Sequence, residues 1–416
     1  MNPRDILLDL FQTAVAAAQP AKRLPSVLPS KPRGRTVVIG AGKASAEMAA
    51  QLEALWSGPL GGVVVTRYGH AVPCRHIRVL EAGHPIPDQN SVDAAHAIRS
   101  QLVGLTKDDL VISLMSGGGS ALLVEPVDGI SLADKQLVTR ALFQAGATIS
   151  ELNLVRQSLS KIKGGKLAAA AWPAQVVTLV ISDVPGDDPS LVASGPTVQP
   201  TSLDVSPLDI VDRLHVSLPE HVRAALAKPA QIAQHGFAHC RTELIATPMQ
   251  SLQAAAQRAR ELGITPLILS DRIEGEAREV AQVHAGIAQC VARYGEPLRA
   301  PAVVLSGGEA KVTFGDVVPG RGGRNAEFLL ALGLALQEAP TISAIACDTD
   351  GVDGSEDNAG AVWLPDSLTQ ARSKNIDLHG YLERHDAYSA FAMLGDLVMT
   401  GPTHTNVNDF RAMLIL

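Results

Sequence analysis

Glycine-rich loops that carry charged side chains are the features of this 416-residue sequence best suited to chemistry. The first, at residues 39–49, reads IGAGKASAEMA and places Lys43 where an apolar run ends and a helical pattern begins. Glycines at such a point allow a tight turn and let an anion approach the backbone at the start of a helix. We expect Lys43 to face a phosphate there, but a packed turn with a solvated lysine explains this loop alone equally well.

The first loop completes neither standard nucleotide-binding fingerprint. A dinucleotide-binding turn has Gly or Ala where Ser45 stands, and an acid after the second strand, where this chain has Thr66 and Arg67. A P-loop has glycine in place of Val37, and Ser or Thr in place of Ala44. The sequence therefore disfavours NAD and excludes a P-loop kinase, while Arg67 keeps an NADPH reductase open as an alternative.

A second loop, SGGGS, follows a strongly apolar run at residues 110–115. Three consecutive glycines cost conformational entropy, which is offset where bare backbone N–H groups bind an anion. No G-x-S-x-G pattern accompanies the loop, so a hydrolase nucleophile is unsupported. We expect its first serine to contact substrate and the other four residues to bind phosphate: Ser116, then Gly117, Gly118, Gly119 and Ser120.

Three aspartates lie in one turn-rich segment, VISDVPGDDPSLVASGPT, at residues 180–197. Clustered carboxylates repel one another unless a divalent cation or a proton-accepting role offsets the repulsion. We expect Asp183 to act as a base or as an Mg²⁺ ligand and Asp187 to be a second candidate ligand. Asp188 alone is better explained as a turn residue.

Three further glycine-rich segments lie in the second half of the chain. GRGGRNAEF at residues 320–328 runs into a helical pattern, so its N–H groups, the helix dipole and Arg324 converge on one point, as phosphoryl transfer requires. The acidic loop at residues 347–361 departs from the EF-hand pattern, and Asp350 is its best candidate for a nucleotide or metal contact. The remaining expected nucleotide-binding residues are Gly307, Gly308, Glu309 and Asn325.

Two polar segments give weaker signals for the substrate. In LNLVRQSLSKIKGGKLA, at residues 152–168, a basic helix end carries Arg156 and Lys161, either of which could bind a substrate carboxylate. His84 precedes a proline and is a candidate substrate contact, although a lone histidine is more often structural.

Composition limits the possible classes of protein. A hydrophobic fraction of 46% with only 19% charged residues indicates a folded globular chain. The net charge of −7 and the lack of a long basic run argue against nucleic acid, and no apolar run is long enough to span a bilayer. The four cysteines show no C-x-x-C spacing, and acids interrupt the apolar N-terminus, so we expect a reduced cytoplasmic protein without a signal peptide. Its oligomeric state, including a homo-oligomer, stays open.

Apolar runs rich in Val and Ile alternate with helical patterns, which predicts an α/β fold with a Rossmann-like, mostly parallel sheet. The length indicates two domains. Residues 198–236 contain no convincing strand, so we place the boundary there, with an N-terminal domain at 1–235 and a smaller α/β domain at 236–416. A helix at the extreme N-terminus could pack on either domain.

Taken together, the long motifs resemble those of the glycerate 2-kinase (MOFRL) family, in the same order and over nearly the whole chain. The resemblance implies two α/β domains with the active site in the cleft between them, a functional Lys43, a functional Arg324, ATP as co-substrate and Mg²⁺. His404 departs from the family, which usually has a second glycine in GPTGTNVND. The matching segments are GAGKASAEMA, GHPIPDQNS, SGGGSALL, LNLVRQSLSKIKGGKLA, ISDVPGDDPSLVASGPT, SGGEAKVTF, GRGGRNAEF, TDGVDGSEDNAGA and GPTHTNVNDF.

The resemblance implies transfer of the ATP γ-phosphoryl group to the 2-hydroxyl of D-glycerate. In that reaction Lys43 and Arg324 would contact the transferring group, because phosphoryl transfer needs alignment and cations more than covalent chemistry. Asp183 would orient or deprotonate the hydroxyl, or hold Mg²⁺. Members of the family are also labelled hydroxypyruvate reductases, which makes a reductase the main alternative, and a non-enzymatic sugar-acid sensor is a third.

Overall fold

The computed structural model describes residues 2–201, 205–228, 235–315, 317–337 and 339–416. The chain forms two compact units, one made of Pro20–Ile245 and the other of Met1–Gln19 together with Ala246–Leu416. We call them the parallel-sheet unit and the mixed-sheet unit. Within the described residues, no helix combines the length and the apolar character needed to cross a bilayer.

The parallel-sheet unit is built on a six-stranded sheet with the order β3-β2-β1-β4-β5-β6. The pairings β2–β3, β1–β2, β1–β4 and β4–β5 are all parallel. The central strands are buried along their length, as their continuous Val and Ile runs predict. The strands are β1 (Thr36–Ala41), β2 (Gly61–Arg67), β3 (Ile77–Ala82), β4 (Leu110–Met115), β5 (Gln175–Ile181) and β6 (Cys240–Ala246).

This strand order is that of a Rossmann fold, so the predicted fold of the N-terminal half is confirmed. The order reverses between β1 and β4, and ligands of such sheets bind beyond the carboxyl ends of the strands at this switch point. The loops that carry Lys43, Ser116 and Asp183 follow β1, β4 and β5 in turn. The topology therefore places them along one edge of the sheet.

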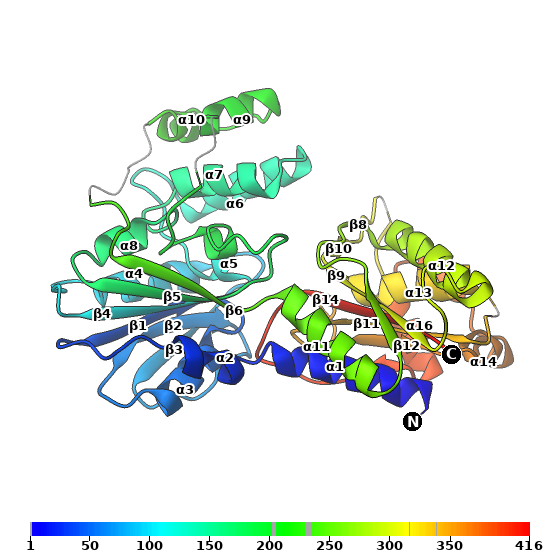
Figure 1. The fold of residues 1–416 in the computed structure, drawn as a ribbon. Coiled ribbons are helices and arrows are strands. Elements are labelled where there is room, and N and C mark those ends of the chain that lie inside the picture. The colour runs from blue at the N-terminus through cyan, green and yellow to red at the C-terminus, as the bar shows by residue number, and fades with distance from the viewer. Residues whose placement is uncertain (1, 202–204, 229–234, 316, 338) are drawn as a thin grey trace. The chain divides into compact units, whose positions relative to one another are not determined.

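Four helices of this unit form a small core of their own: α6 (Leu132–Gln144), α7 (Ile149–Ser158), α9 (Pro207–Arg213) and α10 (Glu220–Leu226). Figure 1 shows them stacked in two layers, cyan to green. Two of them lie in the segment 198–236 that we read as a boundary, since short capped helices leave little periodicity in the sequence. The other helices are α2 (Pro20–Val27), α3 (Ser45–Leu55), α4 (Gln89–Ser100), α5 (Gly119–Leu122) and α8 (Lys166–Ala170), with a 3₁₀ turn at Val192–Ser194.

The mixed-sheet unit has a six-stranded sheet with the order β13-β12-β11-β14-β9-β7, in which only the pairing of β7 with β9 is parallel among those of the described residues. The strands are β7 (Thr265–Ile268), β9 (Ala302–Gly308), β11 (Ile342–Asp348), β12 (Gly360–Trp363), β13 (Leu397–Val398) and β14 (Asp409–Ile415), with a separate pair of β8 (Gly275–Glu276) and β10 (Ala310–Lys311).

Helices cover both faces of the mixed sheet (Figure 1). Alternate strand residues enter opposite cores, as the period of two requires: Val303 and Leu305 pack on one face, and Ala302 and Val304 on the other. The first face is covered by α1 (Pro3–Ala17) and α11 (Pro248–Glu261), and the second by α12 (Ala277–Tyr294), α13 (Arg324–Leu336) and α16 (Ala387–Leu394). Two short helices, α14 (Ser367–Ser373) and α15 (Leu378–Glu383), complete the unit.

The N-terminal helix belongs to the mixed-sheet unit, a choice the sequence left open. Leu7, Leu10 and Phe11 of α1 are buried in its core, and the Phe11 ring lies 5.8 Å from that of Phe410. The chain passes from the parallel-sheet unit into the mixed-sheet unit after Ile245, because β6 belongs to the parallel sheet. The expected division at 235/236 therefore lies about ten residues too early.

Candidate functional site

The turn that carries Lys43 has its backbone donors already engaged. Gly42 N donates to Val65 O at 3.1 Å, Lys43 N to Gly117 O at 2.8 Å, and Ser45 N to Gly42 O at 3.1 Å. Ala44 N donates to Ser116 Oγ at 3.0 Å. These N–H groups are therefore not available to an anion, contrary to what we expected of this turn. Its contribution to a site is the half-buried side chain of Lys43, whose backbone is bonded to the loop after β4.

The glycines of this region allow several loops to meet. A β-carbon on Gly42 would lie 2.1 Å from Ser116 Oγ, so only glycine fits there. Gly118 adopts a φ of +79°, and a β-carbon on it would lie 2.9 Å from His84 Nε2 and 3.3 Å from Lys43 Cγ. The structure therefore brings Lys43 and His84 together over the SGGGS loop.

Ser120, at the end of the SGGGS loop, enters a buried hydrogen-bond network that the sequence did not reveal. Its Oγ lies 2.8 Å from Ser194 Oγ, which donates to Asn153 Oδ1 at 2.8 Å. Lys163 Nζ donates to Ser120 O at 3.0 Å and to Ala193 O at 3.4 Å. Ala193 and Ser194 have φ values of +54° and +61°, a conformation that costs of order 1–3 kcal/mol per residue. The lysine therefore joins the glycine loop to a strained segment.

Four basic side chains, Lys135, Arg156, Lys163 and Lys166, gather around the C-terminal end of α7. Lys135 Nζ donates to Arg156 O at 3.1 Å and Leu159 O at 3.2 Å, which satisfies carbonyls that a helix end leaves without partners. Lys163 is buried beside them; burial first, then repulsion from Lys135 and Arg156, lowers the pKa of Lys163 well below its usual value. Burial also lowers the pKa of Arg156 to about 10 and that of Lys166 to about 8. An anionic ligand beside such a group would raise these pKa values again, because its charge favours the protonated forms.

Lys161 does not join this cluster. Its Nζ donates to Asp128 Oδ1 at 2.5 Å, and it lines a surface pocket together with Arg99 and Trp172. Of the two candidates for a carboxylate clamp, Arg156 is the one that the structure places near Lys163 and hence near the SGGGS loop.

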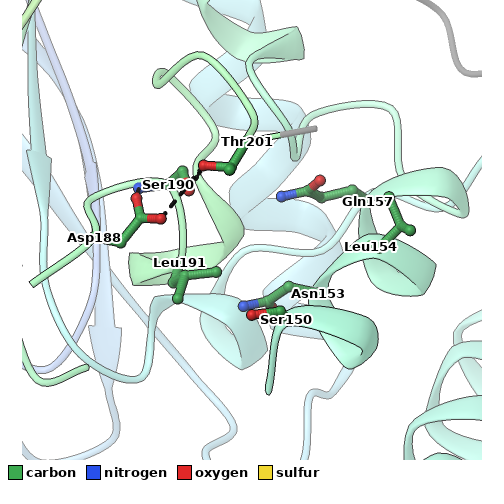
Figure 2. Close-up of a pocket in the computed structure, with 8 residues that line it drawn as sticks. All are labelled: Ser150, Asn153, Leu154, Gln157, Asp188, Ser190, Leu191 and Thr201. Carbon is green, nitrogen blue, oxygen red and sulfur yellow. Dashed lines mark hydrogen bonds between the residues drawn. The ribbon is translucent and has the colours of Figure 1, made fainter. Parts of the chain in front are cut away.

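The aspartates after β5 fall into two groups. Asp183 is half-buried directly beyond the strand, and Asp187 adopts a φ of +57° with its N–H bonded to Val184 O at 3.1 Å. Asp188 has the turn role that we expected: its Oδ1 accepts from Ser190 N at 2.9 Å. Asp188 lines a small pocket of about 60 Å³. In Figure 2 it lies opposite side chains of α7. The pocket is lined by Ser150, Asn153, Leu154, Gln157, Asp188, Ser190, Leu191 and Thr201.

In the mixed-sheet unit, Arg324 contacts three carboxylates. Its Nε donates to Asp409 Oδ1 at 2.7 Å, its Nη2 to Asp348 Oδ2 at 2.9 Å, and its Nη1 to Glu309 Oε1 at 3.3 Å. Burial alone would lower the pKa of Arg324, but these carboxylates, Asp409 foremost, hold it well above its usual value. The guanidinium is thus a permanent, rigidly held cation whose side chain is 23% exposed.

Asp409, which the sequence analysis did not single out, is the centre of this network. It is fully buried at the start of β14 and also accepts from Asn325 Nδ2 at 2.8 Å and pairs with Arg411. Burial would raise the pKa of Asp409, but the two arginines lower it. The GPTHTNVND motif was the available signal, because its last residue is this aspartate.

The N-terminus of α13 already holds an anion. Asn325 N donates to Asp353 Oδ1 at 2.9 Å, and Ala326 N to Asp353 Oδ2 at 2.8 Å. Burial raises the pKa of Asp353 to about 6 even though both oxygens accept N–H groups. These amides are therefore not available to a phosphate, contrary to the role expected for this helix start, and Asp353 was missed in favour of Asp350.

The SGGE glycines serve close packing. Gly307 N donates to Ser270 O at 2.8 Å, and a β-carbon on Gly308 would lie 2.3 Å from Ile273 N. Asp350 is 1% exposed, and its Oδ1 accepts from Val352 N at 2.9 Å. The expected nucleotide contacts of these glycines and of Asp350 therefore find no support in the geometry.

His404, the departure from the family motif, adopts a φ of +60°. Glycine is the usual residue in that left-handed region, so the chain keeps the turn that the family's glycine would allow. Its neighbour Thr403 donates from its N–H to Asp350 O at 3.1 Å and from its Oγ1 to Thr349 O at 2.5 Å.

Comparison with known proteins finds matches in both units. Residues 6–227 match a family described as a domain of unknown function, DUF4147, and residues 302–409 match the MOFRL family. A protein of Agrobacterium vitis provisionally named hydroxypyruvate reductase is 54% identical, over 100% of this chain and 95% of its own. Glycerate 2-kinase of Pyrococcus horikoshii is 36% identical, over 100% of this chain and 98% of its own.

A solved structure agrees with these matches. The crystal structure of glycerate kinase from Thermotoga maritima superposes with a TM-score of 0.87 at 32% identity, covering 99% of both chains. The resemblance drawn from the motifs is thus confirmed, and the chain belongs to the MOFRL family, whose members include the glycerate 2-kinases.

Proposed function

We propose that this protein is an ATP-dependent glycerate 2-kinase, which transfers the γ-phosphoryl group of ATP to the 2-hydroxyl of D-glycerate and releases ADP and 2-phosphoglycerate. The observation that carries the proposal is the fixed position of Lys43 at the switch point, where Lys43 N and Ala44 N bond to the SGGGS loop. Because the backbone that carries it is fixed, the Lys43 cation can neutralise charge on a transferring phosphoryl group with little reorganisation. The names of the glycerate kinase relatives support the same chemistry.

The same turn argues against the reductase alternative, which the name of the A. vitis relative raises. A dinucleotide pyrophosphate binds to free N–H groups at the turn after β1. Here the N–H groups of residues 42–45 donate to protein acceptors. In addition, Ser45 Oγ, at the third fingerprint position, is buried and donates to Val65 O at 2.6 Å. We therefore favour phosphoryl transfer over hydride transfer.

We assign the remaining roles from position and charge. Lys43 contacts the transferring phosphoryl group, and the SGGGS loop binds phosphate oxygens. Arg324, in the mixed-sheet unit, is a second cation for the phosphates of the nucleotide. Arg156, among the buried basic side chains at the end of α7, binds the glycerate carboxylate. Asp183 orients or deprotonates the attacking hydroxyl. His84, next to Lys43 over Gly118, contacts substrate.

The available carboxylates fit an Mg²⁺ ion whose coordination shell is completed by substrate phosphates. Among the described residues, no three His, Cys, Asp or Glu side chains gather as a complete protein cage. Mg²⁺ in kinases is bound through one or two carboxylates with the substrate phosphates completing its shell. Asp183 and Asp187 are the carboxylates that would hold it, and the ion would supply charge neutralisation at the phosphates.

Two assays on the purified protein test the proposal. The first supplies D-glycerate, ATP and Mg²⁺ and follows ADP release, with ³¹P NMR to distinguish 2-phosphoglycerate from 3-phosphoglycerate. The second supplies hydroxypyruvate and NADPH and follows absorbance at the nicotinamide band. We expect turnover in the first alone. NADPH oxidation without ADP release would replace the kinase by the reductase.

A further inference from the structure

A pocket of about 500 Å³ lies wholly within the mixed-sheet unit, beside Arg324. Its walls come from β10, from the start of α13 and the segment before it, from Gly354 and Ser355, and from His385 shortly after α15. Its volume lies within the range of small-molecule sites, which is about 300–1,000 Å³. The proposed reaction gives a role to Arg324 of its lining and leaves the body of the pocket unassigned.

One end of the pocket offers an aromatic surface. Phe314 is 45% exposed, and its ring lies edge-to-face against His385 with 5.2 Å between the ring centres. His385 in turn is fixed, because its Nδ1 lies 3.0 Å from Glu327 Oε1 and 2.9 Å from Arg278 Nη2. An exposed aromatic ring supported by an immobile neighbour in a concave site is suited to stacking against a flat ligand.

Most of the charges that line the pocket are paired. Glu309 pairs with Arg324 at 3.3 Å, and Glu327 pairs with Arg278 at 2.5 Å, which leaves Lys311 as the remaining charged side chain of the lining. A polyanion gains little attraction from such a wall. A neutral heteroaromatic ring with hydroxyl groups gains both stacking and hydrogen bonds to the carboxylates.

We propose that this pocket binds the base and ribose of the nucleotide, with the base against Phe314 and the phosphates leaving the pocket on the side of Arg324. This assignment deepens the proposed kinase function and rests on it for the identity of the nucleotide. The pocket selects the nucleoside, and Arg324 of its lining marks the side on which the phosphates begin.

The test is direct binding, measured by isothermal titration calorimetry with ADP and with adenosine on the full-length protein. Phe314→Ala removes the stacking surface, and Ser355→Trp fills the pocket from an exposed position of its lining. Phe143→Ala, at an exposed phenylalanine of α6 in the other unit, is the matched control. Because base stacking contributes strongly to nucleotide binding, we expect Phe314→Ala to weaken ADP and adenosine about tenfold. Ser355→Trp should weaken both at least as much, and Phe143→Ala should change neither.

The outcomes separate this inference from the function on which it rests. If the protein phosphorylates glycerate but the Phe314 and Ser355 variants bind ADP and adenosine like the wild type, the pocket assignment is wrong and the kinase stands. If the wild type binds adenosine and the two variants lose it, yet no glycerate is phosphorylated, the pocket stands and the kinase assignment falls. If the wild type binds neither ADP nor adenosine and phosphorylates no glycerate, both fall.

Discussion

Gly42 and Ser116 are packed so closely that a β-carbon on the glycine would lie 2.1 Å from the serine hydroxyl oxygen. That hydroxyl also accepts the N–H of Ala44, so the same contact fixes the backbone that carries Lys43. The loops after β1 and β4 are thereby bonded together at the point where the strand order reverses.

Replacing Gly42 by alanine should therefore lower activity more than the same replacement at a glycine with open space around it. The new methyl group must displace Ser116, and it would also be strained at a φ of +139°. We expect kcat/KM for glycerate to fall at least about tenfold, since small misplacements of catalytic groups are costly. Gly69→Ala is the control, because Gly69 also has a positive φ, +76°, but has nothing within 4 Å. Equal activity losses in the two variants would show that strain, and not the contact with Ser116, is responsible.

Lys43→Ala should lower kcat on the order of a hundredfold or more, because it removes a charge-assisted contact made mainly in the transition state. The KM for glycerate should change much less. Lys107→Ala, at an exposed lysine of the same unit, provides the control for net charge. A folded Lys43→Ala protein with nearly normal kcat would remove Lys43 from the mechanism.

Arg324→Lys should impair both activity and folding. A single ammonium group cannot bond to Asp409, Asp348 and Glu309 at once, and Asp409 is fully buried. Leaving a buried carboxylate short of a partner costs about 3–5 kcal/mol. Chemical denaturation measures the loss, and an unchanged midpoint would mean that Arg411 alone suffices for Asp409.

Asp353→Asn should destabilise the mixed-sheet unit by about 1–3 kcal/mol, because one of two acceptors facing the N–H groups of Asn325 and Ala326 becomes a donor. Urea denaturation, followed by far-UV circular dichroism, gives the free energy of unfolding. Asp357→Asn, at an exposed aspartate of the same loop, is the matched change. A larger loss for Asp357 than for Asp353 would contradict the capping role.

Stability should depend on pH through Lys135. Burial lowers the pKa of Lys135 in the folded protein to about 7, from 10.5 in an exposed lysine. Between these values the unfolded chain binds a proton that the folded chain lacks, so the free energy of unfolding rises with pH, by at most about 1.4 kcal/mol per pH unit for one group. Below pH 7 both states are protonated and this dependence ends.

The check is Lys135→Met, for which the rise in the free energy of unfolding between pH 7 and 10 should be smaller than in the wild type. The comparison uses the slope with pH and not the stability at one pH, because the substitution also leaves Arg156 O and Leu159 O without their donor. Parallel slopes for the two proteins would contradict the lowered pKa of this lysine.

Much of this fold could be predicted from local sequence patterns. The buried Val and Ile runs of β1 and β4 predicted a parallel sheet, and the loops that follow them contain Lys43 and Ser116, which the structure brings together. Strand ends are predictable because a parallel sheet places them on one edge. By contrast, α9 and α10 were missed, since short helices that depend on packing against α7 have weak signals of their own.

What the sequence could not provide is which donors remain available. Glycines beside Lys43 and before Arg324 both suggested open anion sites, but Ser116 and Asp353 fill these positions from segments far away in the chain. Asp353 and Asp409 became recognisable only when α13 and β14 were placed beside each other. Such pairings depend on tertiary contacts between distant residues, which no local spacing encodes.

The position of α1 has a practical meaning for dissecting the protein. The chain enters the mixed-sheet unit, leaves it after Gln19 and returns at Ala246, so no single stretch of sequence contains that unit. A fragment of residues 246–416 would uncover the side of Phe410 that Phe11 protects and would be prone to aggregate. Independent expression of this half requires a circularly permuted gene in which α1 is fused to it by a linker.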